Sequence, residues 1–116
     1  MRLAWLAATV LGIGLGCNNP SGGNTCKNAG ADVTIEARDQ GGFSPTPILV
    51  NRGQTVCWEN AGSVTHTVTT VVPATDTINQ ALPPSSYVEH TFTQITDIDY
   101  YCSYHQQTEQ AVIQVR

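Results

Sequence analysis

The sequence predicts an all-β fold, a Greek-key β-sandwich of seven or eight short strands. The first indication is composition: only 12% of the 116 residues are charged, and many of the others are Thr, Val, Gln, Asn and Gly, which favour strands and turns. The second is that apolar and polar residues alternate in several short runs, whereas no window has a helical period. The third is that Gly and Pro interrupt these runs at short intervals. A chain of this length holds one domain.

The strands are expected where β-branched, aromatic and alternating residues gather between these interruptions. The Gly41-Gly42 pair ends the first strand, residues 51–54 form a turn, and Pro73 stops a β-branched run. Residues 76–86 are expected to be irregular, because they contain two adjacent prolines. The segments expected to be strands are residues 33–37, 48–50, 56–58, 67–72, 87–93, 98–102 and 111–115.

The first 16 residues have the pattern of a secretion signal. Arg2 gives a positive start, residues 3–15 form an apolar run, and small residues precede Cys17. The run is shorter than the ~20 apolar residues that a membrane span needs. We therefore expect residues 1–16 to be a signal peptide and the protein to be exported.

Cys17 resembles the acylated cysteine of a bacterial lipoprotein, which follows a small residue, although the positions before Gly16 differ from the usual signal. Acylation implies a periplasmic or cell-surface protein that is held at the membrane by its lipid alone. Residues 17–31 are then a flexible tether, and residues 32–116 are the folded domain. The alternative is an ordinary cleavage after Gly16 that leaves Cys17 as a thiol.

The charge of the chain excludes one large class of partners. The formal net charge is −4, and removal of Arg2 with the signal leaves four basic against nine acidic residues. A nucleic-acid-binding domain needs a basic face, so we expect no nucleic-acid partner. The sequence also offers no substrate pocket, and we do not expect an enzyme.

Three residues are candidate metal ligands. His66 precedes a β-branched run, and Cys102 and His105 lie at and just beyond the end of the strand 98–102. One thiolate and two imidazoles are the ligand set of a trigonal copper site for electron transfer. A sheet fold can bring the two parts of the chain together. Zinc also binds Cys and His, so the residue types alone leave both metals open.

The four cysteines of the chain can be divided among three roles. If Cys102 binds a metal ion and Cys17 is acylated, Cys26 and Cys57 remain. Two remaining thiols in an oxidising compartment favour a disulfide. The alternative is that Cys26 or Cys57 is a free, buried residue.

Apolar, aromatic, Gly, Pro and Asn residues recur at short intervals before the candidate ligands, and we call them the framework residues. They are Phe43, Pro45, Ile48, Val50, Gly53, Val56, Trp58 and Asn60 before His66, and Phe92, Ile98 and Tyr100 before Cys102. With these residues, the chain from Val33 to Arg116 resembles a cupredoxin of the plastocyanin type. The resemblance implies one copper ion that cycles between Cu(I) and Cu(II) on His66, Cys102 and His105. It also implies transfer of single electrons between transient redox partners, and we expect a monomer.

The resemblance also implies a fourth, axial ligand. Plastocyanin-like proteins place a Met five residues after the loop histidine, but here that position is Gln110, and the only Met of the chain is Met1. A Gln in this role resembles the stellacyanins, and its amide oxygen favours Cu(II), which predicts a lower reduction potential than with Met. Strand phase indicates Glu109 instead, because Glu109 shares the phase of Ala111 and the inward-facing residues after it. A third possibility is that neither residue binds.

Two other functions stay open on the sequence. A copper carrier would bind the same ion and deliver the metal instead of the electron. A metal-free cupredoxin-like module would use the sandwich for protein interaction alone. Reversible reduction with the copper retained separates electron transfer from both.

Overall fold

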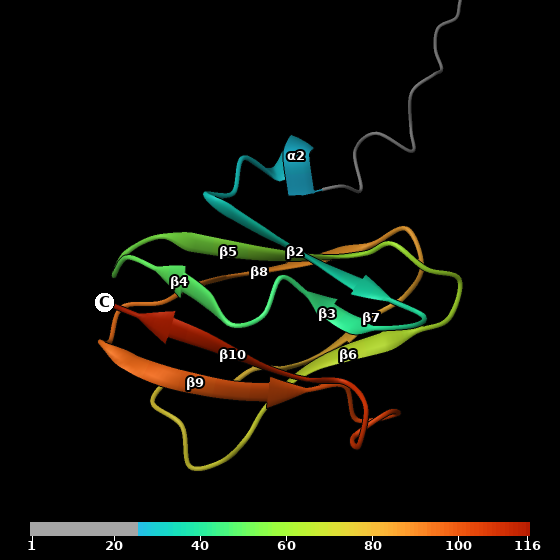
Figure 1. Cartoon of the computed structure of the whole chain (residues 1–116). Coiled ribbons are helices and arrows are strands. Elements are labelled where there is room, and N and C mark those ends of the chain that lie inside the picture. The colour runs from blue at the N-terminus through green and yellow to red at the C-terminus, as the bar shows by residue number, and fades with distance from the viewer. Residues whose placement is uncertain (1–25) are drawn as a thin grey trace, which may run out of the picture.

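The computed structural model describes residues 26–116, which form one short helix and nine strands (Figure 1). No helix in this part of the chain is long and apolar enough to cross a membrane. Residues 1–16 and Cys17, the predicted signal and lipid anchor, lie outside the described residues. The elements are α2 (Cys26–Ala29), β2 (Val33–Arg38), β3 (Gly42–Ser44), β4 (Ile48–Val50), β5 (Thr55–Asn60), β6 (His66–Thr70), β7 (Asn79–Leu82), β8 (Tyr87–Thr91), β9 (Thr96–Tyr101) and β10 (Gln110–Val115).

The strands form two sheets packed as a β-sandwich, with β5 and β8 in the upper layer of Figure 1 and β9 and β10 in the lower layer. One sheet has the order β3-β2-β5-β8, and the other has the order β4-β10-β9-β6-β7. Each sheet contains one parallel pair, β2 with β5 and β4 with β10, among antiparallel pairs. The predicted all-β sandwich is confirmed, with nine described strands instead of seven or eight.

The core between the sheets is centred on four aromatic residues. Tyr100 lies edge-to-face with Trp58, with ring centroids 5.6 Å apart, and is tilted against Phe43 at 4.8 Å. Phe92 meets Trp58 edge-on at 6.3 Å, and all four side chains are at most 2% exposed. Such pairs contribute about 0.5–1.5 kcal/mol each beyond their buried area. The cluster therefore fixes β5 against β9 across the sandwich.

Two strands lie where the sequence predicts none. β7 lies within residues 76–86 and is an edge strand in which three of four residues are exposed, so it lacks an apolar alternation. β3 is a three-residue edge strand that begins at Gly42, the residue expected to end a strand. Both strands are held by pairing with a longer neighbouring strand, β2 for β3 and β6 for β7. A local sequence pattern does not reveal such pairing.

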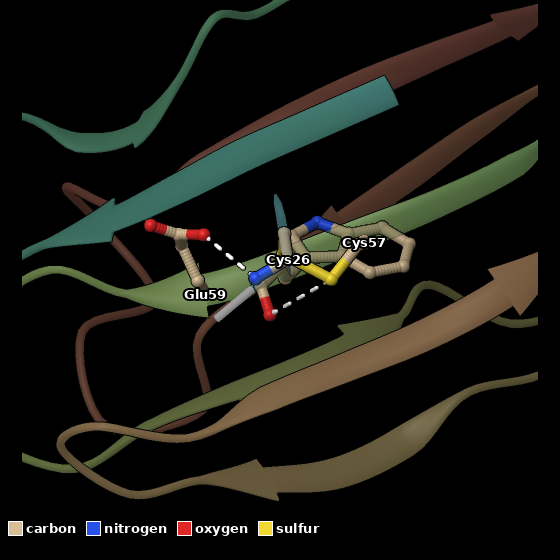
Figure 2. The surroundings of a disulfide bond; sticks show 4 residues. Cys26, Cys57 and Glu59 are labelled. Carbon is tan, nitrogen blue, oxygen red and sulfur yellow. Dashed lines mark hydrogen bonds between the residues drawn. A yellow bond between two sulfur atoms is a disulfide. The ribbon is translucent and has the colours of Figure 1, made fainter. Parts of the chain in front are cut away.

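A disulfide joins Cys26 of α2 to Cys57 of β5, as the cysteine count predicts (Figure 2). Both residues are buried, with 1% and 0% of their surface exposed. The Cys26 N–H also donates a hydrogen bond to the carboxylate of Glu59 at 3.0 Å (Figure 2). The part of the predicted tether that the structure describes, residues 26–31, is therefore attached to the domain and includes a helical turn.

We expect the Cys26→Ser/Cys57→Ser double variant to unfold with a free energy about 3–4 kcal/mol lower than that of the wild type, because the bond joins residues 31 apart and removes chain entropy from the unfolded state. Urea denaturation followed by tryptophan fluorescence measures the difference. Wild-type protein under reducing conditions is the control and should behave like the double variant. Equal stability of the oxidised wild type and the double variant would contradict a stabilising role.

Candidate metal centre

Four potential metal ligands gather at one end of the sandwich. They are His66, the first residue of β6; Cys102, which directly follows β9; and His105 and Glu109 in the loop between β9 and β10. One donor atom from each residue lies within 4.8 Å of the donor atoms of the other three. His66, Cys102 and Glu109 are buried, whereas the side chain of His105 is 42% exposed. The two predicted parts of the site are thus brought together by the fold.

The pairing of β9 with β10 decides which residue of the loop lies beside Cys102. Gln110 is opposite Tyr101 in the antiparallel register, so Cys102 is opposite Glu109, and the Cys102 N–H donates to the Glu109 carbonyl at 3.0 Å. Directly opposite residues project their side chains from the same face of a sheet. Cys102 and Glu109 therefore project toward the same site, and Gln110 shares the opposite face with Tyr101.

Gln110, the axial ligand expected from the loop count, lies outside this group of residues. Its side chain is exposed, and its amide nitrogen donates a 2.7 Å hydrogen bond to the carbonyl of Gln106. Glu109, the alternative that strand phase indicates, is 2% exposed and belongs to the group. The structure brings the three predicted ligands together with Glu109 and not with Gln110.

The carboxylate of Glu109 lies between the two imidazoles. Its Oε1 is 2.9 Å from Nδ1 of His66 and 3.1 Å from Nδ1 of His105, and the latter nitrogen is 3.6 Å from Sγ of Cys102. Its Oε2 is also 2.9 Å from Nδ1 of His66, but outside hydrogen-bond geometry, so this buried oxygen has no hydrogen-bond partner. A buried carboxylate is costly unless it is paired or binds a cation.

The chemistry of these donors fits a soft or borderline metal ion. One sulfur, two imidazole nitrogens and one carboxylate oxygen face a common centre, whereas calcium and magnesium take oxygen ligands. Burial raises the pKa of the Cys102 thiol, so the protonated form is favoured while no metal is bound. Metal binding would release that proton, because the thiolate is the ligand form.

Gly42, at the start of β3, packs closely against Glu109. A Cβ atom at Gly42 would lie 3.1 Å from Cγ of Glu109 and 3.4 Å from the carbonyl oxygen of Thr108. The φ angle of Gly42 is +69°, in the left-handed region that favours glycine. Glycine at this position therefore allows β3 to pack closely against Thr108 and Glu109.

Thr67 connects β6 to the loop that carries the other ligands. Its N–H donates to Sγ of Cys102 at 3.4 Å, and its Oγ1 accepts a 2.8 Å hydrogen bond from the N–H of Ser103. Within the loop, the His105 N–H donates to the Cys102 carbonyl at 3.1 Å, and the Glu109 N–H donates to the His105 carbonyl at 2.9 Å. These hydrogen bonds fix the conformation of the loop and its position beside β6.

Two polar residues, Asn60 and Asp39, hold the loop before His66. No sequence pattern indicates this role for Asp39. The side-chain amide of Asn60 donates to the Val64 carbonyl at 2.7 Å. The carboxylate of Asp39 accepts hydrogen bonds from Ser63, and these lower the pKa of Asp39 to about 2. The same carboxylate is 3.3 Å from Nε2 of His66. An Asp after a strand is common in turns, so the sequence alone does not indicate this contact.

No protein-family model and no curated protein matches the sequence. Among solved structures, the fold is similar to a purple cupredoxin from Nitrosopumilus maritimus, with 26% identity and a TM-score of 0.64 over 73% of this chain and 100% of that chain. It is also similar to a reduced amicyanin mutant, with 21% identity and a TM-score of 0.66 over 76% of this chain and 84% of that chain. A third similar structure is oxidised plastocyanin from Dryopteris crassirhizoma, with 17% identity and a TM-score of 0.62 over 72% of this chain and 99% of that chain.

These three solved structures are cupredoxins, the family indicated by the framework residues and ligand spacing of the sequence. The likeness covers 72–76% of this chain in all three comparisons. The chain therefore has the cupredoxin fold.

Proposed function

We propose that the protein is a type 1 copper protein that transfers single electrons between redox partners. The observation that carries this proposal is the convergence of one sulfur, two imidazoles and one carboxylate at one end of a cupredoxin fold. His66, Cys102 and His105 are three of the proposed ligands, and Glu109 is the fourth in place of Gln110. Copper, when bound, supplies a one-electron Cu(I)/Cu(II) couple.

The contribution of the protein is to hold these ligands in nearly fixed positions. The register of β9 and β10 sets Cys102 beside Glu109, and the start of β6 places His66 in a fully buried position. The hydrogen bonds of Thr67 join the two parts of the site. A ligand set held in this way by its surroundings rearranges little when one electron is gained or lost.

Glu109 gives the proposed site a different electronic character from a Met-ligated relative. A carboxylate oxygen is a harder donor than a thioether and carries a negative charge, and both properties favour Cu(II) over Cu(I). The charge acts at close range in a buried position, where solvent screens it weakly. We therefore expect a low reduction potential for this class of site.

The exposed part of the site is the proposed route for electrons. His105 has a side chain that is 42% exposed, and two large apolar side chains on the ligand-bearing loops, Tyr104 and Val64, are 63% and 45% exposed. Exposed apolar side chains on these loops, together with an exposed ligand, suit brief contacts of small area with another redox protein. The proposed partners are accordingly transient redox proteins.

We further propose that the protein is an exported monomer, anchored to a membrane through an acylated Cys17. The support is the signal-like pattern of residues 1–16 and the disulfide between Cys26 and Cys57, a bond typical of oxidising compartments. The periplasm and the cell surface are both consistent with this support.

We expect the full chain loaded with Cu(II) to have an intense visible absorption band that bleaches with ascorbate and returns on oxidation, because a thiolate bound to copper gives such a band. The Cys102→Ser variant should lose the band while its far-UV circular dichroism remains that of the wild type. Absorption and circular dichroism spectra of both proteins check this expectation. A wild-type protein that stays colourless and takes up no copper would contradict the proposed function.

The same samples distinguish electron transfer from copper delivery. For an electron-transfer protein, we expect one copper ion per chain to be retained through repeated cycles of reduction and oxidation. The copper content after gel filtration of the reduced protein measures retention. Release of Cu(I) to a weak chelator during the cycle would favour the carrier instead.

We expect Glu109→Gln to raise the reduction potential by on the order of 59 mV or more, equivalent to a tenfold change in the relative affinity for Cu(I) and Cu(II), because it removes an anionic donor. Gln110→Ala is the matched control and should leave the potential unchanged, since that side chain is exposed. Voltammetry of the two copper-loaded variants measures both values. A larger shift in Gln110→Ala would instead support the ligand expected from the loop count.

A further inference from the structure

Asp39 lies in the turn between β2 and β3, and its carboxylate has four close polar neighbours. Its Oδ2 accepts hydrogen bonds from the N–H and the hydroxyl of Ser63, both at 2.8 Å. Its Oδ1 is 3.3 Å from the backbone nitrogen of Val64 and 3.3 Å from Nε2 of His66. These neighbours hold the carboxylate in one position, and in that position it faces the ring nitrogen of His66 that points away from Glu109.

Gly62 provides the space that the Asp39 carboxylate occupies. A Cβ atom at Gly62 would clash with Oδ1 and Cγ of Asp39. The Gly62 N–H donates a 2.8 Å hydrogen bond to Oδ1 of Asn60, which limits how far the loop can move away. The loop that leads into His66 therefore also fixes the position of the Asp39 carboxylate.

His66 is 0% exposed and has a carboxylate at each ring nitrogen, Glu109 at Nδ1 and Asp39 at Nε2. A buried imidazole N–H requires an acceptor. When Nδ1 binds a metal ion, the proton is carried by Nε2, and Oδ1 of Asp39 is the acceptor at hydrogen-bond distance in the described structure.

We propose that Asp39 is a positioning residue of the copper centre, one that orients His66 through Nε2 and, by its negative charge, favours Cu(II). This inference rests on the proposed function and adds to it a residue outside the ligand set. Carboxylate–histidine–metal arrangements of this kind fix the tautomer and the ring orientation of the ligand and increase its basicity.

The test uses the full chain with Asp39→Asn. An Asn cannot accept both from His66 and from Ser63, because one of its two positions carries an NH₂ group. We expect a loss of copper affinity of roughly 10–100-fold and a shift of the reduction potential to a higher value. In the Zn(II)-substituted protein, the Nε2 proton of His66 should exchange slowly in the wild type and rapidly in the variant, as measured by NMR.

Two further variants make the test specific. Gly62→Ala keeps the charge of Asp39 but displaces its carboxylate, so it should weaken copper binding and speed the exchange of the Nε2 proton, even if Asp39→Asn fails to fold. Asp97→Asn removes one exposed charge near the start of β9 and should leave all three measurements unchanged.

The outcomes separate this inference from the proposed function. If Asp39→Asn and Asp97→Asn have the same copper affinity, potential and exchange rate, the role of Asp39 is overturned and the copper site stands. If the wild type takes up no copper, the proposed function fails, and the positioning role at a copper centre fails with it.

Discussion

The antiparallel register of β9 and β10 is the constraint on which the rest of the site depends. It sets Cys102 opposite Glu109, and a shift by one residue would turn Glu109 to the outer face and bring a neighbour inward. The register is in turn fixed by the apolar residues that both strands bury, such as Tyr100, Ile113 and Val115. Core packing along β9 and β10 therefore decides which residue of the loop lies beside Cys102.

The ligand-bearing loops have no regular structure of their own and take their shape from polar side chains on the strands and the β2–β3 turn. Thr67 holds the loop after β9, and Asn60 and Asp39 hold the loop before β6. This arrangement places the buried carboxylate of Glu109 between the imidazoles of His66 and His105, where a bound cation would offset the cost of burying its charge. Metal binding is therefore expected to add to stability through linkage, because the assembled site exists in the folded protein alone.

Much of the fold and part of the site could be predicted from the sequence. Alternation, β-branched and aromatic residues and the Gly and Pro interruptions together identified seven of the nine described strands, and cysteine parity identified the disulfide. For the proposed fourth ligand, counting residues from His105 indicates Gln110, whereas the phase of β10 indicates Glu109. The structure places Glu109 beside Cys102, because strand pairing and not loop length sets the direction of a side chain. β7 and Asp39 could not be predicted, since each depends on contacts with residues distant in sequence.

The attachment of α2 by the disulfide changes the reach of any anchor that precedes it. Figure 1 shows α2 on the outer side of the layer that contains β5, and Cys26 is covalently joined to that strand. For a chain anchored at Cys17, nine residue steps (26 minus 17) separate the lipid from this fixed point, or about 30 Å at full extension. If the chain were free as far as the start of β2, the largest possible distance between the lipid and the domain would be considerably greater. In such a chain the disulfide would limit the distance between the lipid and the β5 face of the domain to about 30 Å, because the segment after Cys26 could not extend it.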